Sequence, residues 1–528
     1  MKVAMEKIKN FYQQNKPESK TSSIYVILLA LIVVFFMVTN LIWLSRDSLP
    51  PAWDQSGHLF LSLKYYRVIA NAHSLASFND FFSVSHYYPP LFHLCAVGII
   101  FLCGFSEHNL IMVNFIFLIL LTISLYGIGK RLFNRRVGIM AVVLCLFYPI
   151  IFALSREYLL DFALVSMVSV VVYLILKSEG GLKSPGNIVL GIAVAGAVLI
   201  KPIAVIFFLP VWVFVLLSRR KEKLSFLPVA VSLAISLLII LPWYMVAIKD
   251  MLALNKYFQN VATVVEGDPV KIIPSILWFR SVFINTLMSP NLAKFFLAGF
   301  ILSFVFTRKW KNFVTLLFWV VPGLVVLVFT PSKDPRYIMP ILPALALLTI
   351  SGIDMIRKNI IRNILYALII IISYVQFYNL SFGMFFDLIK EKSSYYGHVP
   401  LRSDWKNREI INYLRKNFGN KPMIIGVLPD CQYFNVPEFQ LYAYLFNLPY
   451  GIETVGNSSV DLEQLKKYDI FITKYPKIAA EWGVSYRDKF YNEISKIGMD
   501  NLGFRQLLAF KLPDNSTAIL YLNLHNEK

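Results

Sequence analysis

Long apolar runs separated by short polar segments make up most of the chain before residue 382. A helix needs about 20 apolar residues to cross the hydrocarbon core of a bilayer, and most of the runs reach or approach that length. We therefore predict an α-helical polytopic membrane protein, with a transmembrane domain over residues 24–382. Twelve runs qualify: 24–44, 89–105, 109–128, 137–153, 159–177, 187–200, 202–218, 226–247, 291–307, 312–330, 337–356 and 364–382.

The pattern changes after Asn379, where charged residues and short alternating segments replace the apolar runs. These segments predict a small α/β domain over residues 390–528. Its glycines form neither a GxGxxG nor a GxxxxGK motif, so we assign it no nucleotide site. The expected elements are an amphipathic helix from Asp404, strands at 423–428 and 470–472, helices at 434–446 and 462–467, and a hairpin of 510–512 with 518–522.

Composition agrees with a membrane location, since 57% of the 528 residues are hydrophobic and the mean hydropathy is +0.60. The net charge of +20 comes largely from short basic clusters between apolar runs. Membrane topology explains such clusters, and nucleic acid is excluded as a partner. Cys95, Cys103 and Cys145 lie in apolar runs and Cys431 stands alone, so no disulfide framework or CxxC metal site is indicated.

Six basic clusters set the expected orientation, because positive charge in short loops stays in the cytoplasm. All six fall on one side if the run 89–105, which starts with two prolines, dips into the membrane and returns. The alternative is that 89–105 crosses the membrane and that a different one of the twelve runs does not. Eleven crossings then make residues 1–23 a cytoplasmic tail and place the first outer loop, 45–108, and the C-terminal domain outside. The clusters lie in the tail and near 130–136, 177–183, 219–221, 308–311 and 357–362.

The first candidate for chemistry is Asp54, which follows the first apolar run by a few residues. A carboxylate at the boundary between lipid headgroups and water can act as a general base on an incoming hydroxyl. The alternative is that Asp54 or Ser56 merely caps an interfacial helix. Nearby His58, His86 and Tyr88 are candidate substrate-binding residues. Whether a divalent metal ion assists is left open, since lone interface histidines are commonly hydrogen-bonded bystanders.

Two further acids, Glu157 and Asp161, precede or begin the run 159–177 on the expected outer face. They are four residues apart, which predicts that they share one helical face. We assign both to catalysis and Arg156 to substrate binding. The alternative is a capped helix start with a local pair between Arg156 and Glu157.

Separated cations complete the set. Lys201 interrupts an apolar stretch, and an intramembrane lysine is a functional hypothesis by default. Lys333 and Arg336 lie in a short outer loop, against the usual bias of positive charge, and Tyr337 follows them; these residues suit a phosphate. The alternatives are a lysine that snorkels to the interface and a loop neutralised by Asp334. Acids and cations on one membrane face predict a site that holds a phosphate leaving group and deprotonates an acceptor.

The chain resembles the GT-C membrane glycosyltransferases of family 39 type, which include protein O-mannosyltransferases and lipid A aminoarabinose transferases. The resemblance implies a multi-spanning fold and a polyprenyl-phosphate sugar donor. It also implies that Asp54 is the base, that Asp161 is the second acid, and that Lys201 and Arg336 lie near the donor phosphate. It rests on Asp54 and on the segments 88–91, 131–133, 155–161, 201–202, 241–244 and 336–340.

We therefore expect an inverting glycosyltransferase in the plasma membrane that moves a sugar from a polyprenyl-phosphate donor to a lipid, glycan or protein acceptor. The alternative from another class is a transporter or flippase of a lipid-linked sugar, with Lys201 and Asp161 as translocation residues. That alternative predicts inverted repeats with broken helices in matching halves, which the sequence does not display. A third hypothesis, an assembly protein without catalysis, leaves Asp54, Asp161 and Lys201 without a purpose.

The expected orientation can be tested with cysteines placed on the two sides. A cysteine near Asn134 should resist a membrane-impermeant thiol reagent in intact cells, while a cysteine near Asn457 should react. The reverse labelling would contradict the model of eleven crossings.

Overall fold

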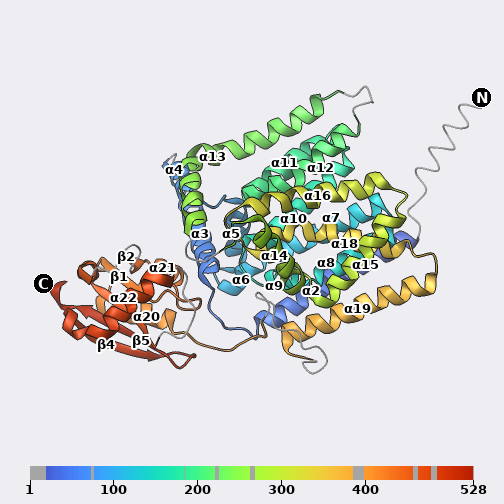
Figure 1. The fold of residues 1–528 in the computed structure, drawn as a ribbon. Helices are drawn as coiled ribbons and strands as arrows, with labels where there is room; N and C mark the ends of the chain where they lie inside the picture. The colour runs from blue at the N-terminus through green and yellow to red at the C-terminus, as the bar shows by residue number, and fades with distance from the viewer. Residues whose placement is uncertain are drawn as a thin grey trace, which may run out of the picture.

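The computed structural model describes residues 20–72, 76–183, 185–219, 225–261, 268–384, 398–455, 462–476 and 484–526. A helical body, coloured blue to yellow-orange in Figure 1, is followed by a smaller α/β domain in orange and red at one end of it. A mostly helical protein with a small C-terminal α/β part is the fold class that the sequence predicted.

The helical body consists of α-helices joined by short turns (Figure 1). Its helices are α2 (Lys20–Leu44), α3 (Trp53–Ala70), α4 (Ala76–Ser83), α5 (Leu91–Cys103), α6 (Glu107–Ile111), α7 (Val113–Leu132), α8 (Arg135–Leu146), α9 (Pro149–Leu154), α10 (Leu160–Lys177), α11 (Gly186–Ile200), α12 (Val205–Leu217), α13 (Leu227–Val261), α14 (Ile272–Val282), α15 (Pro290–Phe306), α16 (Trp310–Phe329), α17 (Pro335–Ile338), α18 (Leu342–Asp354) and α19 (Asn359–Phe382). Short 3-10 or π turns are η1 (Pro202–Ala204), η3 (Phe283–Leu287) and η4 (Met339–Ile341).

Seven helical segments in the described part of the chain are long and apolar enough to cross a membrane. An eighth is added if the pair α14 with η3 and α15, bent by 112°, counts as one span. Helices α5, α11 and α12 are apolar but shorter. Helix α5 has 13 residues, and at 1.5 Å per residue it extends about 20 Å, less than a typical hydrocarbon core. The predicted count of eleven crossings stays a prediction.

The centre of the body is formed by α7, α8, α10 and α18, whose side chains belong to one continuous apolar cluster. Helices α15 and α18 approach closely because glycines face each other: a Cβ at Gly352 would lie 1.9 Å from the carbonyl oxygen of Gly299. Small residues that let backbones meet are a common means of packing helices in lipid. Helices α2, α13 and α19 lie at the periphery and expose apolar side chains, as lipid-facing helices do.

The segment 45–108 contains α3, α4 and α5, and α5 falls within the run 89–105, where a helix was expected. Two other expectations about the helical body were wrong in detail. The expected loop 248–290 is also largely helical, because α13 continues to Val261 and α14 follows. The run 137–153 is divided between α8 and α9, since Pro149 lacks the N–H that an unbroken helix would need.

The α/β domain contains a five-stranded sheet of order β2-β1-β3-β5-β4. Strands β1, β2 and β3 are parallel, while β5 is antiparallel to β3 and β4. Alternate side chains of β3 enter two apolar clusters, one with α20 and α21 and the other with α22, so helices cover both faces. The elements are α20 (Asn407–Phe418), β1 (Met423–Leu428), α21 (Val436–Leu445), β2 (Tyr450–Thr454), η5 (Leu462–Lys467), β3 (Ile470–Tyr475), α22 (Val484–Ile497), η6 (Asp500–Leu502), β4 (Phe504–Lys511), β5 (Thr517–Asn523) and η7 (Leu524–Asn526).

The domain docks on the helical body through α21, which packs along α3 (Figure 1). Arg67 of α3 lies over the ring of Tyr444 and donates to the carbonyl oxygen of Leu445. The ring of Phe60 also packs edge-on against Tyr444. The sequence predicted the first helix, β1, β3 and the hairpin of this domain, and it missed β2 and α22.

Candidate functional site

Four charged side chains from distant parts of the chain form one connected ionic chain. Asp54 Oδ2 lies 3.0 Å from Arg336 Nη1, although the two residues are 282 positions apart. The same guanidinium nitrogen lies 3.9 Å from Asp161 Oδ2, and Lys201 Nζ lies 2.7 Å from Asp161 Oδ1. We call these four residues the ionic chain and the end of the helical body that carries them the site end.

Breaks between helices place these side chains. Asp54 and Asp161 lie in the first turns of α3 and α10, where the positive end of a helix dipole stabilises a carboxylate. Lys201 adopts an extended conformation between α11 and η1, so its side chain leaves the helix axis. Arg336 lies in α17, whose first residue is a proline.

The capping alternatives do not hold for the two acids. The N-caps of α3 and α10 are Ala52 and Leu159, and neither makes a side-chain capping hydrogen bond. The carboxylates of Asp54 and Asp161 bind cations instead, and Lys201 is held by Asp161 rather than directed only at the interface.

A third carboxylate, Asp334, binds the other side of the Arg336 guanidinium, with Nη2 at 2.6 Å and Nε at 2.8 Å. It also caps α17 by accepting from the Arg336 backbone N–H. Burial alone would raise the pKa of Asp334, but the charge and hydrogen bonds of Arg336 outweigh it and hold this pKa below its ordinary value. Arg336 is therefore clamped on one side and faces Asp54 and Asp161 on the other.

Aromatic and imidazole rings border the ionic chain. Lys201 Nζ lies 4.9 Å from the ring centre of Tyr337, within range of a cation–π contact. His58 packs edge-on against Tyr88, and its Nδ1 lies 3.3 Å from Nε2 of His93. Burial, followed by the neighbouring His93 and the positive charges of the ionic chain, lowers the pKa of His58 well below its ordinary value. His58 is thus neutral and can donate or accept a hydrogen bond.

Glu157 lies beside the ionic chain, but not for the expected reason. Helix α10 begins at Leu160, so Glu157 belongs to the preceding turn and does not share a helical face with Asp161. Its Oε2 accepts from Gln55 Nε2 at 3.4 Å. Burial raises the pKa of Glu157 to about 8, with Arg336 opposing the shift and Asp161 adding to it.

Three of the predicted substrate-binding residues have other partners. His86 binds Asp250 of α13 at 2.7 Å. Arg156 is buried among aromatic rings, including that of Phe377, and its Nε donates to Asn40 rather than pairing with Glu157.

Lys333 is also accounted for by local structure. Its ammonium group binds the last carbonyl groups of α16, including that of Leu327 at 3.0 Å, and so caps the helix as a cation at its negative end. We therefore leave Lys333, His86 and Arg156 out of the site that is proposed below.

The sequence did not connect the C-terminal domain with these residues. Trp53, next to Asp54, donates from its indole Nε1 to Asp430 Oδ1 at 3.2 Å. Asn435 donates to the carbonyl oxygen of Pro51 at 3.1 Å. Their position in the sequence could have pointed to these two residues, since Asp430 and Asn435 are polar and lie just beyond the carboxyl end of a predicted strand.

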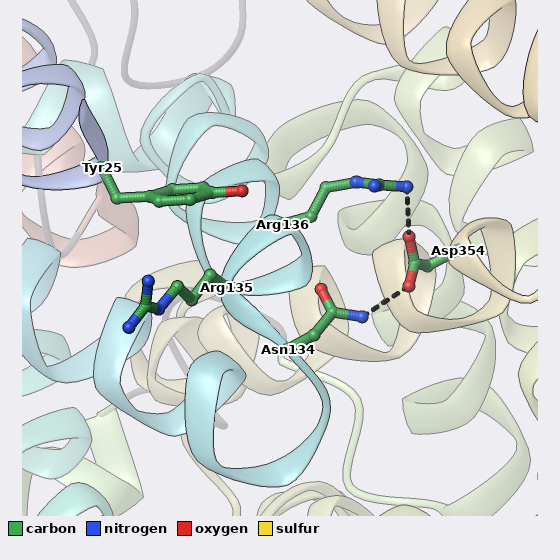
Figure 2. A pocket seen from close by; sticks show the side chains of 5 residues that line it. All are labelled: Tyr25, Asn134, Arg135, Arg136 and Asp354. Carbon is green, nitrogen blue, oxygen red and sulfur yellow. Dashed lines mark hydrogen bonds and ion pairs between the residues drawn. The ribbon is translucent and has the colours of Figure 1, made fainter. Parts of the chain in front are cut away.

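A surface cavity of about 520 Å³ lies away from the ionic chain. Figure 2 shows its lining, with Asn134 and Arg136 directed toward Asp354, and with Tyr25 and Arg135 on the other side. It borders the far end of α7, whose first residues contact Glu157 through Asn114, and the 20 residues of α7 separate the two ends by about 30 Å. The cavity therefore belongs to the end of the body opposite the site end.

No group of three or more His, Cys, Asp and Glu side chains in the described ranges has the spacing of a metal site. His58 and His93 form a pair of adjacent imidazoles beside the ionic chain.

Comparisons with known proteins support the fold that the resemblance implied. The family model described as dolichyl-phosphate-mannose-protein mannosyltransferase matches residues 88–245. The structure of ArnT from Cupriavidus metallidurans bound to undecaprenyl phosphate aligns over 92% of this chain and 97% of its own, with 14% identity and a TM-score of 0.54. The archaeal oligosaccharyltransferase AglB from Archaeoglobus fulgidus, in complex with an inhibitory peptide and a dolichol-phosphate, aligns over 95% and 74%, with 11% identity and a TM-score of 0.55.

This chain is a membrane protein with the GT-C fold of glycosyltransferases. No curated protein matches it by sequence. The family model covers Asp161 and Lys201 of the ionic chain, while Asp54 and Arg336 lie outside the matched residues. The ArnT alignment covers 92% of this chain, so it includes the helical body and most of the C-terminal domain.

The raised pKa of Glu157 predicts a pH dependence of stability. Between its ordinary value of 4.5 and about 8, folded Glu157 keeps a proton that the unfolded chain has released. The unfolded state then binds fewer protons, so stability falls as pH rises through this range. Glu157→Gln resembles the protonated acid and should remove this contribution, so its melting temperature should fall less than that of the wild type between pH 5.5 and 8.5.

The matched control is Glu493→Gln in the C-terminal domain, where the carboxylate is exposed. This variant should follow the wild-type pH dependence in the same detergent. Equal pH dependence in all three proteins would contradict the assignment of a buried, protonated Glu157.

Proposed function

We propose that the protein is a glycosyltransferase that moves a sugar from a polyprenyl-phosphate donor to an acceptor hydroxyl on the outer face of the plasma membrane. The observation that carries the proposal is the ionic chain, in which Asp54, Arg336, Asp161 and Lys201 meet at one end of a GT-C fold. Similar solved structures were obtained with undecaprenyl phosphate and with a dolichol-phosphate, which supports a lipid phosphate as the donor class here.

Two cations in the ionic chain suit a phosphate. Lys201 and Arg336 bind the two carboxylate oxygens of Asp161, at 2.7 Å and 3.9 Å, so they face one anion from two directions. A phosphate group offers more acceptor oxygens than a carboxylate, and an Arg fork with a Lys point charge can hold it by charge-assisted hydrogen bonds. In the proposed complex, Lys201 and Arg336 stabilise the charge that develops on the departing phosphate.

Asp54 is the proposed base because it is the most accessible acid of the ionic chain. Its side chain is 46% exposed, whereas that of Asp161 is 2% exposed. Asp54 takes the proton of the acceptor hydroxyl while the acceptor oxygen bonds to the anomeric carbon. The bond from that carbon to the phosphate oxygen breaks, and its electron pair leaves with polyprenyl phosphate, so the configuration inverts. Asp161, buried between the two cations, keeps them in place.

This division of roles also assigns the neighbouring groups. Neutral His58 and the hydroxyl groups of Tyr88 and Tyr337 offer hydrogen bonds to the sugar without adding charge. Glu157, protonated near neutral pH, can donate a hydrogen bond to a substrate close to Gln55, the neighbour of Asp54. An assay with a panel of polyprenyl-phosphate sugars and candidate hydroxyl acceptors would identify the acceptor and show whether the sugar is a hexose or a pentose.

Asp54→Asn tests the proposed base. The amide keeps the size of the side chain and can still accept from Arg336, but it does not take up a proton near neutral pH. The variant should express and bind polyprenyl phosphate as the wild type does, while turnover falls by roughly two or more orders of magnitude, the scale expected for losing a general base. Release of polyprenyl phosphate from a labelled donor gives the rate.

The matched control is Asp80→Asn, the same substitution at an exposed acid of α4. Its turnover should equal that of the wild type. Transfer at a near wild-type rate by Asp54→Asn would show that Asp54 is structural and is not the base.

A further inference from the structure

The C-terminal domain binds the chain at two residues just before Asp54, namely Pro51 and Trp53. Trp53 Nε1 donates to Asp430 Oδ1 at 3.2 Å, and Asn435 Nδ2 donates to the carbonyl oxygen of Pro51 at 3.1 Å. Both domain residues are buried, with 8% of Asp430 and none of Asn435 exposed. The bond to Pro51 is buried and the bond to Trp53 is partly buried, and together they join the domain to the start of α3.

Asp430 lies at a special position of the sheet. In the sheet, β1 lies between β2 and β3. The chain passes from β1 to β2 on one side and then crosses to β3 on the other side, so the strand order reverses at β1. In open α/β sheets, the carboxyl end of the strand at such a switch point is the usual place for a ligand. Asp430 follows β1 there, and Thr454 at the end of β2 donates to its Oδ2 at 3.0 Å. In this protein the indole of Trp53 lies at that position and binds Asp430.

Asn435 performs a second, separate task at the same edge. Its Oδ1 caps α21 by accepting from the Glu438 backbone N–H at 3.0 Å. Its Nδ2 is then directed at Pro51, whose carbonyl oxygen also accepts from Ser56 Oγ at 2.7 Å. The start of α21 and the start of α3 therefore share one hydrogen-bonded junction.

We propose that Asp430 and Asn435 are positioning residues that hold the first turn of α3 so that Asp54 faces Arg336. Through them the C-terminal domain becomes part of the catalytic apparatus rather than an appended module. The inference rests on the proposed function for its effect on catalysis, but the positioning itself can be measured without any substrate. Asp430 binds Trp53 and Asn435 binds Pro51, so we assign each an effect that acts through one of these two residues.

Hydrogen exchange in the full-length protein tests the positioning directly. Asn435→Asp keeps the capping oxygen but replaces the N–H donor to Pro51 with a second oxygen, and Asp430→Ala removes the acceptor for Trp53. In both variants, amides of residues 52–58 should exchange about 10-fold faster, while amides of β1 keep their wild-type protection. The matched control Thr454→Val removes a hydrogen bond from the same Asp430 carboxylate, on the side away from Trp53, and should leave residues 52–58 unchanged.

Unchanged exchange over residues 52–58 in both variants would overturn the proposal. So would faster exchange spread equally over β1 and α3, since that result indicates only a loosened domain. These outcomes do not depend on the proposed function, because no sugar transfer is measured.

Kinetics then test whether the positioning serves catalysis. Trp53→Phe keeps an aromatic ring but loses the N–H, and it should lower kcat about 10-fold with little change in the KM for the donor, because a misplaced reacting group costs rate more than binding. Asp430→Ala should do the same, and the double variant should lose no more than the larger single loss. Asp430→Asn, which keeps an acceptor oxygen for Trp53, should restore most of the rate.

Additive losses, or no rescue by Asp430→Asn, would contradict a shared path through the bond between Trp53 and Asp430. If the wild-type protein transferred no sugar from any polyprenyl-phosphate donor, the proposed function would fail, while the exchange result would still decide the positioning.

Discussion

The carboxylate of Asp161 holds the site end together. It is 2% exposed and binds Lys201 at 2.7 Å and Arg336 at 3.9 Å, so it joins α10, the break between α11 and η1, and α17. Removing one partner of a buried ion pair costs about 3–5 kcal/mol, because the remaining charge is left uncompensated. A charge buried this deeply is costly unless it is paired. Here the pairing holds Lys201 and Arg336 together at the site end.

The surrounding geometry follows from this constraint. The ionic chain forms where helices begin or break, and the positive ends of α3 and α10 stabilise the carboxylates of Asp54 and Asp161 there. Asp334 neutralises the far side of the Arg336 guanidinium and so leaves its near side for Asp54 and Asp161. Asp54 is the exposed member, held from outside the membrane body by Trp53 and the C-terminal domain. Rigid cations and one accessible acid suit transfer from a charged leaving group.

Sequence reasoning found the residues whose chemistry is unusual for their surroundings. Acids and a lysine among apolar runs identified Asp54, Asp161 and Lys201, and the structure brings all three together. The sequence could not show that Arg336 belongs to the site and Lys333 does not, because both cations lie in the same short segment. Only the fold shows that the Lys333 side chain turns back to cap α16. Arg156 was similarly ambiguous, since most of its aromatic neighbours, Trp43, Phe377 and Phe382, lie more than 100 positions away in the sequence. The contact of Trp53 with Asp430 spans 377 positions and has no local pattern.

Binding of polyprenyl phosphate, followed by thermal unfolding, tests the central claim most directly. A ligand that binds only the folded state at 100 times its Kd stabilises it by about 2.7 kcal/mol. The wild type should be stabilised by undecaprenyl phosphate, and the neutral pair Lys201→Gln with Asp161→Asn, which leaves no buried charge unpaired, should lose most of that stabilisation. Arg136→Gln at the opposite end should keep it. Equal stabilisation of all three proteins would show that the ionic chain does not hold the lipid phosphate.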